Sequence, residues 1–155
     1  MILGVYRETQ RLQAAETLVA HLPDDDELRS HFAKYMCVLT SGYLEECVRL
    51  LLRNYCQHQA GPAVFRFVES AIADITGLKE DKLKALLEQF DPEWARRFEA
   101  HSTQQHKDAL DSVVANRHLI AHGRYMGISL GTSLSYTTRV KEAVRILDEQ
   151  CINGS

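Results

Sequence analysis

Residues 26–58, DELRSHFAKYMCVLTSGYLEECVRLLLRNYCQH, carry the longest unbroken pattern in the chain. Apolar side chains recur in this stretch at steps of three and four residues, the spacing that places them on one face of an α-helix. These apolar positions are Leu28, Phe32, Met36, Leu39, Tyr43, Cys47, Leu50 and Leu51. The acidic run 24–27 leads into the pattern, where negative charge stabilises a helix N-terminus. We therefore expect one long helix from about Asp26 to His58.

The helical period continues on both sides of this stretch, and no segment alternates with the period of two that marks a strand. Pro23 ends a first helix that starts near Tyr6, and the Gly61-Pro62 pair begins a third helix that ends near Gly77. Shorter helices are expected at 83–90, 92–98, 103–122 and 140–151.

The stretch 123–135 is predicted to be a loop, because it contains three glycines among serines and threonines. The remaining segments predict an all-α helical bundle. Its central antiparallel pair would be the helices at 26–58 and 103–122, with short extra helices around them. All 155 residues fit one domain, since domains commonly span about 100–200 residues.

The composition is that of a globular protein, with 45% hydrophobic residues, 25% charged residues and a formal net charge of −3. A negative net charge argues against a protein that coats nucleic acid by bulk attraction, although a local basic site is compatible with it. The four cysteines form no Cys-x-x-Cys pair and are expected as free thiols in a reducing compartment. Without a signal-peptide pattern or a run of roughly 18 apolar residues, we expect a cytoplasmic protein with no membrane contact.

The segment 115–125, ANRHLIAHGRY, contains an arginine where a helix would present apolar residues to the core. The residues of this stripe are Leu110, Val114, Arg117 and Ala121. A charge on such a stripe costs stability unless it is paired and hydrogen-bonded. Glu45 and Glu46 on the long helix are the candidate partners of Arg117, and the apolar stripe of that helix places Glu46 slightly nearer the core. A structural salt bridge is one interpretation of Arg117.

His122 and the charges around Arg117 point instead to a bound anion. His122 lies about 140° around an ideal helix from Arg117, at ~100° per residue, so both serve one site only if the helix ends at His122. Gly123 indicates such an end, because glycine adopts the left-handed C-cap conformation without strain. Residues 112–141 contain no Asp or Glu but include four Lys or Arg residues, Arg117, Arg124, Arg139 and Lys141. The combination predicts a site for phosphate.

The spacing Arg117-His118-x-x-x-His122 resembles the signature of the HEPN superfamily, an arginine followed by four to six residues and a histidine. The polar residue after the arginine, the helix end after the histidine and the acidic position within 41–47, SGYLEEC, fit the same pattern. The phrase at 108–117, DALDSVVANR, resembles the branch often found near ribosomal L-PSP-type proteins, the RiboL-PSP branch. The resemblance covers nearly the whole chain.

This resemblance implies a metal-independent endoribonuclease that uses no cofactor and forms a homodimer around the motif, often as a toxin or antiviral defence effector with an antitoxin partner. It assigns catalysis to Arg117 and His122. Supporting or RNA-binding positions would be Asn116, His118, Glu45, Glu46, Arg124 and Tyr125. Attack by the RNA's own 2′-hydroxyl requires a base, an acid and positive charge on the phosphate, which histidine and arginine supply. A two-fold dimer brings two copies of the histidine to one cleft.

Other functions stay open. Some toxins of the family carry a tyrosine two residues after the histidine, where a nucleotidyltransferase modifies it; here that position is Arg124, and Tyr125 follows. Some members of the superfamily cleave nothing, so a non-catalytic nucleotide- or protein-binding module is the alternative. His118 and His122 also have the four-residue spacing of metal ligands on a helix, but the sequence offers no third ligand beside them.

Overall fold

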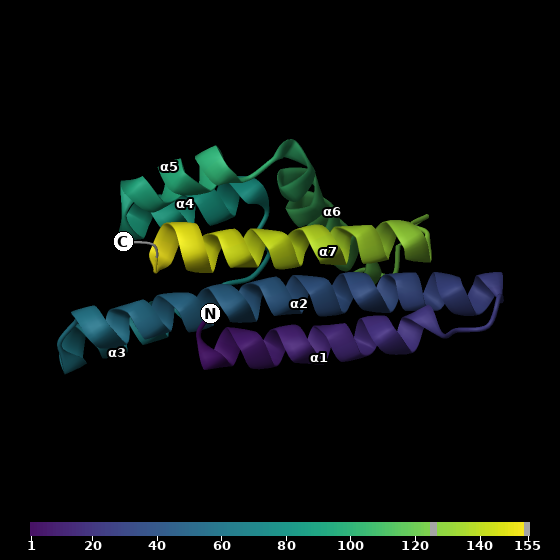
Figure 1. Ribbon diagram of the computed structural model, residues 1–155, viewed down its shortest axis with the longest axis horizontal. Helices are drawn as coiled ribbons and strands as arrows, with labels where there is room; N and C mark the ends of the chain where they lie inside the picture. The colour runs from purple at the N-terminus through teal and green to yellow at the C-terminus, as the bar shows by residue number, and fades with distance from the viewer. Residues whose placement is uncertain (125–126, 154–155) are drawn as a thin grey trace.

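The computed structural model describes residues 1–124 and 127–153, and every regular element within them is helical. The elements are α1 (Leu3–Ala20), α2 (Asp26–Gln59), α3 (Pro62–Ile72), α4 (Glu80–Phe90), α5 (Pro92–His101), α6 (Gln104–Ala121), α7 (Leu130–Ile146) and a π-helical turn, η1 (Leu147–Ile152). The predicted all-α helical bundle is therefore confirmed (Figure 1).

Short polar side chains start several of these helices by accepting hydrogen bonds from backbone amides of the first turn. The Asp25 carboxylate accepts from Leu28 N at 2.8 Å, and the Asp91 carboxylate accepts from Glu93 N at 2.9 Å. The acidic run before α2 is thus a helix cap, as its position in the sequence indicates. Pro62 and Pro92 occupy the first turns of α3 and α5, where no amide proton is needed.

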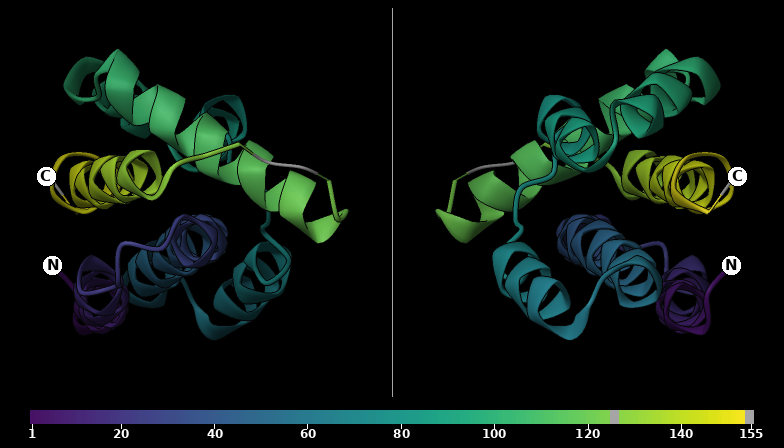
Figure 2. Two further views of the ribbon diagram at one scale, coloured as in Figure 1. Left: turned by 90° about the vertical axis from the view of Figure 1, so that its right-hand side faces the viewer. Right: turned by 90° about the vertical axis from the view of Figure 1, so that its left-hand side faces the viewer.

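The long helix α2 has a different antiparallel neighbour from the one expected. Helix α1 runs antiparallel to it, with the Thr9 and Tyr43 hydroxyls hydrogen-bonded at 3.0 Å (Figure 1). Helix α7 makes the most extensive contact with α2 and runs parallel to it. The predicted antiparallel pairing of 26–58 with 103–122 is wrong, because α6 crosses the direction of α2 and α7 (Figure 2).

Helix α7 takes this place, and its first six residues, 130–135, belong to the predicted loop 123–135. Ser129 caps the helix by accepting from Thr132 N at 3.1 Å, so α7 begins at Leu130. Ser133 and Thr137 are almost fully buried against α2, where the Ser133 hydroxyl donates to the Ala33 carbonyl at 3.0 Å. A face made of small hydroxyl residues does not show the apolar period of a helix, although its groups are satisfied by hydrogen bonds.

One contiguous apolar core joins the helices, and α2 contributes to it along most of its length. The first half of α6 packs into this core through Ala109, Leu110, Val113 and Val114, whereas its last two turns are half-buried or exposed. The crossing helix therefore carries its C-terminal end to the surface. In the part of the chain that the structure describes, no helix has both the length and the apolar character needed to cross a membrane.

Candidate functional site

The C-terminal end of α6 forms one side of a surface pocket of about 290 Å³. Its lining residues are Thr76, Gly77, Val114, Arg117, His118 and Ala121. Four of these lie on successive turns of α6, and Thr76 and Gly77 belong to the loop between α3 and α4. The pocket thus combines Arg117 and His118 with a backbone segment that is distant in sequence, whereas His122, the predicted catalytic histidine, is not among its lining residues.

Arg117 is held by a carboxylate on the long helix. Its Nη1 atom donates to Glu45 Oε1 at 2.7 Å, and the side chain of Glu45 is only 5% exposed. Arg117 itself keeps 36% of its side chain exposed, so it lies at the edge of the core rather than inside it. Among the described residues, Nη1 is the only Arg117 side-chain atom with a protein hydrogen-bond partner. In that part of the chain, Nε and Nη2 therefore have no protein hydrogen-bond partner, and the side chain is partly exposed.

Glu46 pairs with Arg49 of the same helix rather than with Arg117. The carboxylate is half-exposed and accepts from Arg49, with the Oε2–Nη2 distance at 2.9 Å. Glu45, rather than Glu46, is the residue buried toward α6. The expectation that Glu46 lies nearer the core than Glu45 is therefore wrong, because α2 is surrounded by several helices and buries more than the one face that the apolar stripe marks.

His118 and His122 lie side by side at the end of α6. Their ring centroids are 4.4 Å apart with an interplanar angle of 61°, and both residues are exposed. Helix α6 ends at Ala121, with His122 as its C-cap and Gly123 at a φ of 63°. The predicted helix end is confirmed, and it places His122 against His118, which itself lines the Arg117 pocket.

Two of the other predicted site residues, Asn116 and Arg124, lie near the C-terminal end of α6. Asn116 is half-buried, and Arg124 is exposed with its backbone amide donating to the Leu119 carbonyl at 2.9 Å. Tyr125 lies outside the described residues. Within residues 1–124 and 127–153, no group of three or more His, Cys, Asp or Glu side chains is arranged to hold a metal ion.

The loop between α3 and α4 also belongs to the site, although the sequence did not predict this. Gly77 was expected to end a helix, but α3 ends at Ile72, and Gly77 adopts a φ of 62° in the loop that follows. Its backbone amide donates to Glu45 Oε1 at 2.8 Å, the same oxygen that binds Arg117. The only signal for this contact in the sequence was an isolated glycine between two helices.

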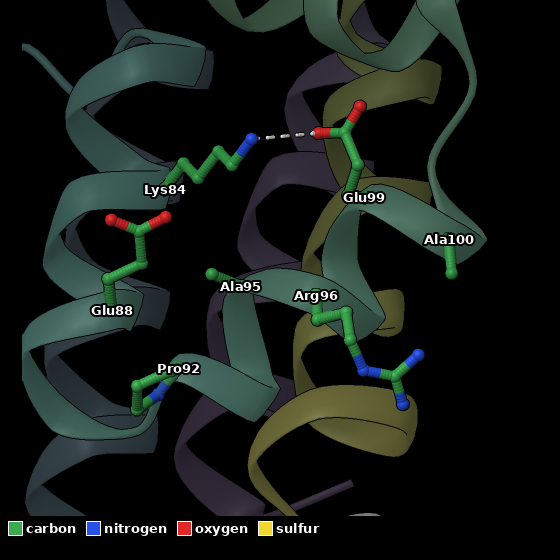
Figure 3. Close-up of a pocket in the computed structure, with 7 residues that line it drawn as sticks. All are labelled: Lys84, Glu88, Pro92, Ala95, Arg96, Glu99 and Ala100. Carbon is green, nitrogen blue, oxygen red and sulfur yellow. Dashed lines mark hydrogen bonds and ion pairs between the residues drawn. The ribbon is translucent and has the colours of Figure 1, made fainter.

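Neither the hollow between α4 and α5 nor the cysteines provide an arginine beside a histidine. A larger hollow of about 580 Å³ lies between α4 and α5, and its lining includes the Lys84–Glu99 ion pair but no histidine (Figure 3). The four cysteines are buried free thiols, and burial raises the pKa of Cys47 and of Cys151 to about 12. These two thiols are therefore protonated at neutral pH and are not nucleophiles.

The fold and the site together define an all-α protein with an arginine–histidine motif at a helix end. A family model described as RiboL-PSP-HEPN matches residues 7–153. The chain therefore belongs to the RiboL-PSP-HEPN family. No curated protein and no solved structure matches the chain significantly. HEPN domains are often RNases, and membership supports an RNase-like or nucleotide-binding module.

Proposed function

We propose that this protein is a metal-independent endoribonuclease that cleaves RNA by attack of the RNA's own 2′-hydroxyl group. The observation that carries the proposal is the pocket at the end of α6. There, Arg117 is fixed by a buried carboxylate and lies beside His118, which contacts His122. The same two residue types, arginine and histidine, are the ones this reaction requires.

Arg117 is suited to the scissile phosphate because its guanidinium group has two edges. Glu45 binds Nη1, while Nε and Nη2 can donate two parallel hydrogen bonds to phosphate oxygens. A donor that is already fixed in position needs no reorganisation when negative charge develops in the transition state. The charge of Glu45 offsets that of Arg117, and Arg124 adds a further positive charge beside the end of α6.

His122 is the proposed proton-transfer group. It takes the proton of the 2′-hydroxyl as that oxygen attacks phosphorus, and the bond from phosphorus to the 5′-oxygen breaks. A second, protonated imidazole then donates a proton to the departing 5′-oxygen. The products are a 2′,3′-cyclic phosphate and a 5′-hydroxyl. Imidazole suits both roles because its proton comes on and off near neutral pH.

The second imidazole is proposed to come from another copy of the chain. Two-fold dimers are the commonest assemblies of soluble proteins, and an exposed helix end can meet its own copy across such an axis. In this arrangement the Arg117 and His122 residues of both chains line one groove. A role as a toxin or defence effector, restrained by an antitoxin protein, fits a small nuclease of this kind.

The test is to incubate the purified protein with a single-stranded RNA and with a DNA of the same sequence, each with and without EDTA. We expect cleavage of the RNA only, unchanged by EDTA, with 2′,3′-cyclic phosphate ends. DNA lacks the attacking hydroxyl and should stay intact. Cleavage of DNA, inhibition by EDTA or linear phosphate ends would favour hydroxide attack at a metal held by His118 and His122.

A non-catalytic module gives a different result in the same experiment. RNA or nucleotide binding that depends on Arg117, without any cleavage, would assign the chain to the binding members of the superfamily. In that case the Arg117–Glu45 pair would serve to join α6 to α2 and to hold the bound nucleotide. The comparison of product formation with binding therefore separates the two functions.

A further inference from the structure

We propose that the loop between α3 and α4, residues 73–79, positions Arg117 for the reaction, and that Gly77 and Arg49 are positioning residues. The effect on catalysis rests on the proposed function, whereas the effect on the geometry of Arg117 does not. The loop lines the pocket through Thr76 and Gly77, opposite the motif on α6.

One carboxylate oxygen connects the loop to the arginine. Glu45 Oε1 accepts from Gly77 N at 2.8 Å and from Arg117 Nη1 at 2.7 Å. Because both donors bind the same atom, the position of the Gly77 amide fixes the oxygen to which Arg117 is anchored. A displacement of the loop would therefore rotate the Glu45 carboxylate and move the guanidinium group with it.

The neighbouring carboxylate holds the same loop through an intermediate residue. Glu46 Oε2 binds Nε and Nη2 of Arg49, at 3.1 Å and 2.9 Å. The remaining Nη1 atom of Arg49 donates to the Ile75 carbonyl at 2.9 Å. Two consecutive acidic residues of α2 thus bind the loop at Ile75 and at Gly77.

Further contacts restrict the loop on its other side. Lys82 Nζ donates to the Thr76 carbonyl, and Leu78 is completely buried in the core. Beyond the loop, the amide of Glu80 donates to Asp111 Oδ1 on α6 at 2.8 Å. A segment whose backbone groups are bound to α2 and α4, and whose end is bound to α6 through Glu80, is rigid enough to fix a reacting group, which a freely moving loop is not.

Gly77 is suited to this position by its backbone conformation. Its φ of 62° lies in the left-handed region, which side chains with a Cβ atom disfavour. A Cβ atom at this position would come no closer than 3.9 Å to Val114 Cγ1, so space does not demand glycine. The requirement is conformational, and asparagine should satisfy it better than alanine.

The first experiment compares Arg49→Ala with Arg53→Ala. Arg53 is a matched control, because it lies one turn further along α2 and pairs with Glu69 on α3, at 2.9 Å. We expect Arg49→Ala to raise hydrogen exchange of the Gly77 amide by about tenfold relative to core amides of α7. We also expect the NMR resonance of Arg117 Nε–H to shift. Arg53→Ala should change neither signal.

The second readout is RNA cleavage, measured well below the melting temperature of each variant. Arg49→Ala and Gly77→Ala should lower kcat by about 10- to 100-fold with a smaller change in KM, because a misplaced group loses transition-state contacts. Gly77→Asn should recover part of the loss, and Arg53→Ala should retain wild-type kcat. Because each variant is assayed well below its melting temperature, a loss of stability alone would leave kcat unchanged.

The outcomes separate the two proposals. If the wild-type protein cleaves no RNA, the proposed function fails, while the exchange and resonance measurements still test the positioning of Arg117. If Arg49→Ala leaves the Gly77 amide and the Arg117 resonance unchanged, the positioning role is wrong whatever the activity. Equal loss of kcat in Arg49→Ala and Arg53→Ala would also overturn it.

Discussion

In the proposed reaction Arg117 binds Glu45 and a phosphate at the same time, which requires a side chain with several donors in one plane. Nη1 is occupied at 2.7 Å, and the other edge remains for the ligand. Lysine would keep the charge but present a single ammonium group in place of the two-edged plane. We therefore treat the guanidinium shape, rather than its charge, as the property that the site requires.

Arg117→Lys is expected to lower kcat/KM for RNA about 100-fold while the protein stays folded, because a transition-state donor is lost but the charge is kept. Arg96→Lys is the control, since Arg96 is an exposed residue of α5 that pairs with Glu93. Steady-state kinetics and circular dichroism measure the two properties. Wild-type activity of Arg117→Lys would show that the guanidinium edge is not used.

The two adjacent histidines have separable roles. His122→Ala should abolish cleavage because it removes the proposed proton-transfer group, whereas His118→Ala should reduce it only mildly. Both side chains are exposed, so neither change should disturb the fold. If residual activity is measurable, the pH dependence of kcat/KM should lose both limbs in His122→Ala, because the substitution removes this histidine from both chains of the proposed dimer. Full activity of His122→Ala, or complete loss in His118→Ala together with inhibition by EDTA, would contradict this assignment.

At the scale of helices, the packing of α7 against α2 depends on buried hydroxyl groups. The Thr40 and Thr137 hydroxyls share a hydrogen bond of 2.8 Å, and both residues are completely buried. Thr137 also donates to the Ser133 carbonyl at 3.0 Å. A parallel helix pair in this bundle is therefore joined by polar contacts as well as apolar ones.

Thr137→Val should destabilise the protein by about 1–3 kcal/mol, because it leaves the buried Thr40 hydroxyl without its partner. Thr138→Val is the matched control, since Thr138 makes the same type of hydrogen bond to the carbonyl four residues before it but is exposed. Urea unfolding of both variants measures the difference. Equal stabilities would show that the buried hydrogen bond contributes nothing net.

Local signals predicted helices well, and contacts between helices were predicted less well. Asp25, Pro62, Pro92 and Gly123 act at the helix end next to them, so their positions alone indicated where helices begin or end. The start of α7 was missed because Ser133 and Thr137 satisfy their polarity through contacts with other turns and helices. Such hydrogen-bond partners can be identified only once the packing of the helices is known.

The same difference, between local signals and contacts between distant segments, applies to the candidate site. The arginine and its two histidines follow from one short segment, and the structure brings them together at one helix end. The choice between Glu45 and Glu46 depends on the rotation of α2 relative to α6. The role of Gly77 depends on a loop that meets α2 across 32 positions in the sequence. Neither property is encoded by residue spacing within a helix.

For the whole molecule, the central question is whether one chain contains a complete site. Each chain already has two imidazoles with centroids 4.4 Å apart, so a second copy is not needed merely to supply two histidines. Neighbouring imidazoles on one face, however, cannot readily lie on opposite sides of a phosphate, which in-line attack and departure require. Two helix ends that face each other across a two-fold axis meet this requirement.

A mixing experiment tests this dimer. Wild-type and His122→Ala chains are unfolded, combined and refolded together, so that subunits assort at random. If cleavage needs the His122 of both chains, an equal mixture should retain about one quarter of the wild-type activity, because only wild-type pairs are active. If each chain acts alone, the mixture should retain about one half. Light scattering at micromolar concentration should show a mass of two chains. A linear dependence of activity on the wild-type fraction, or a single-chain mass with full activity, would contradict the shared groove and assign both proton transfers to one chain.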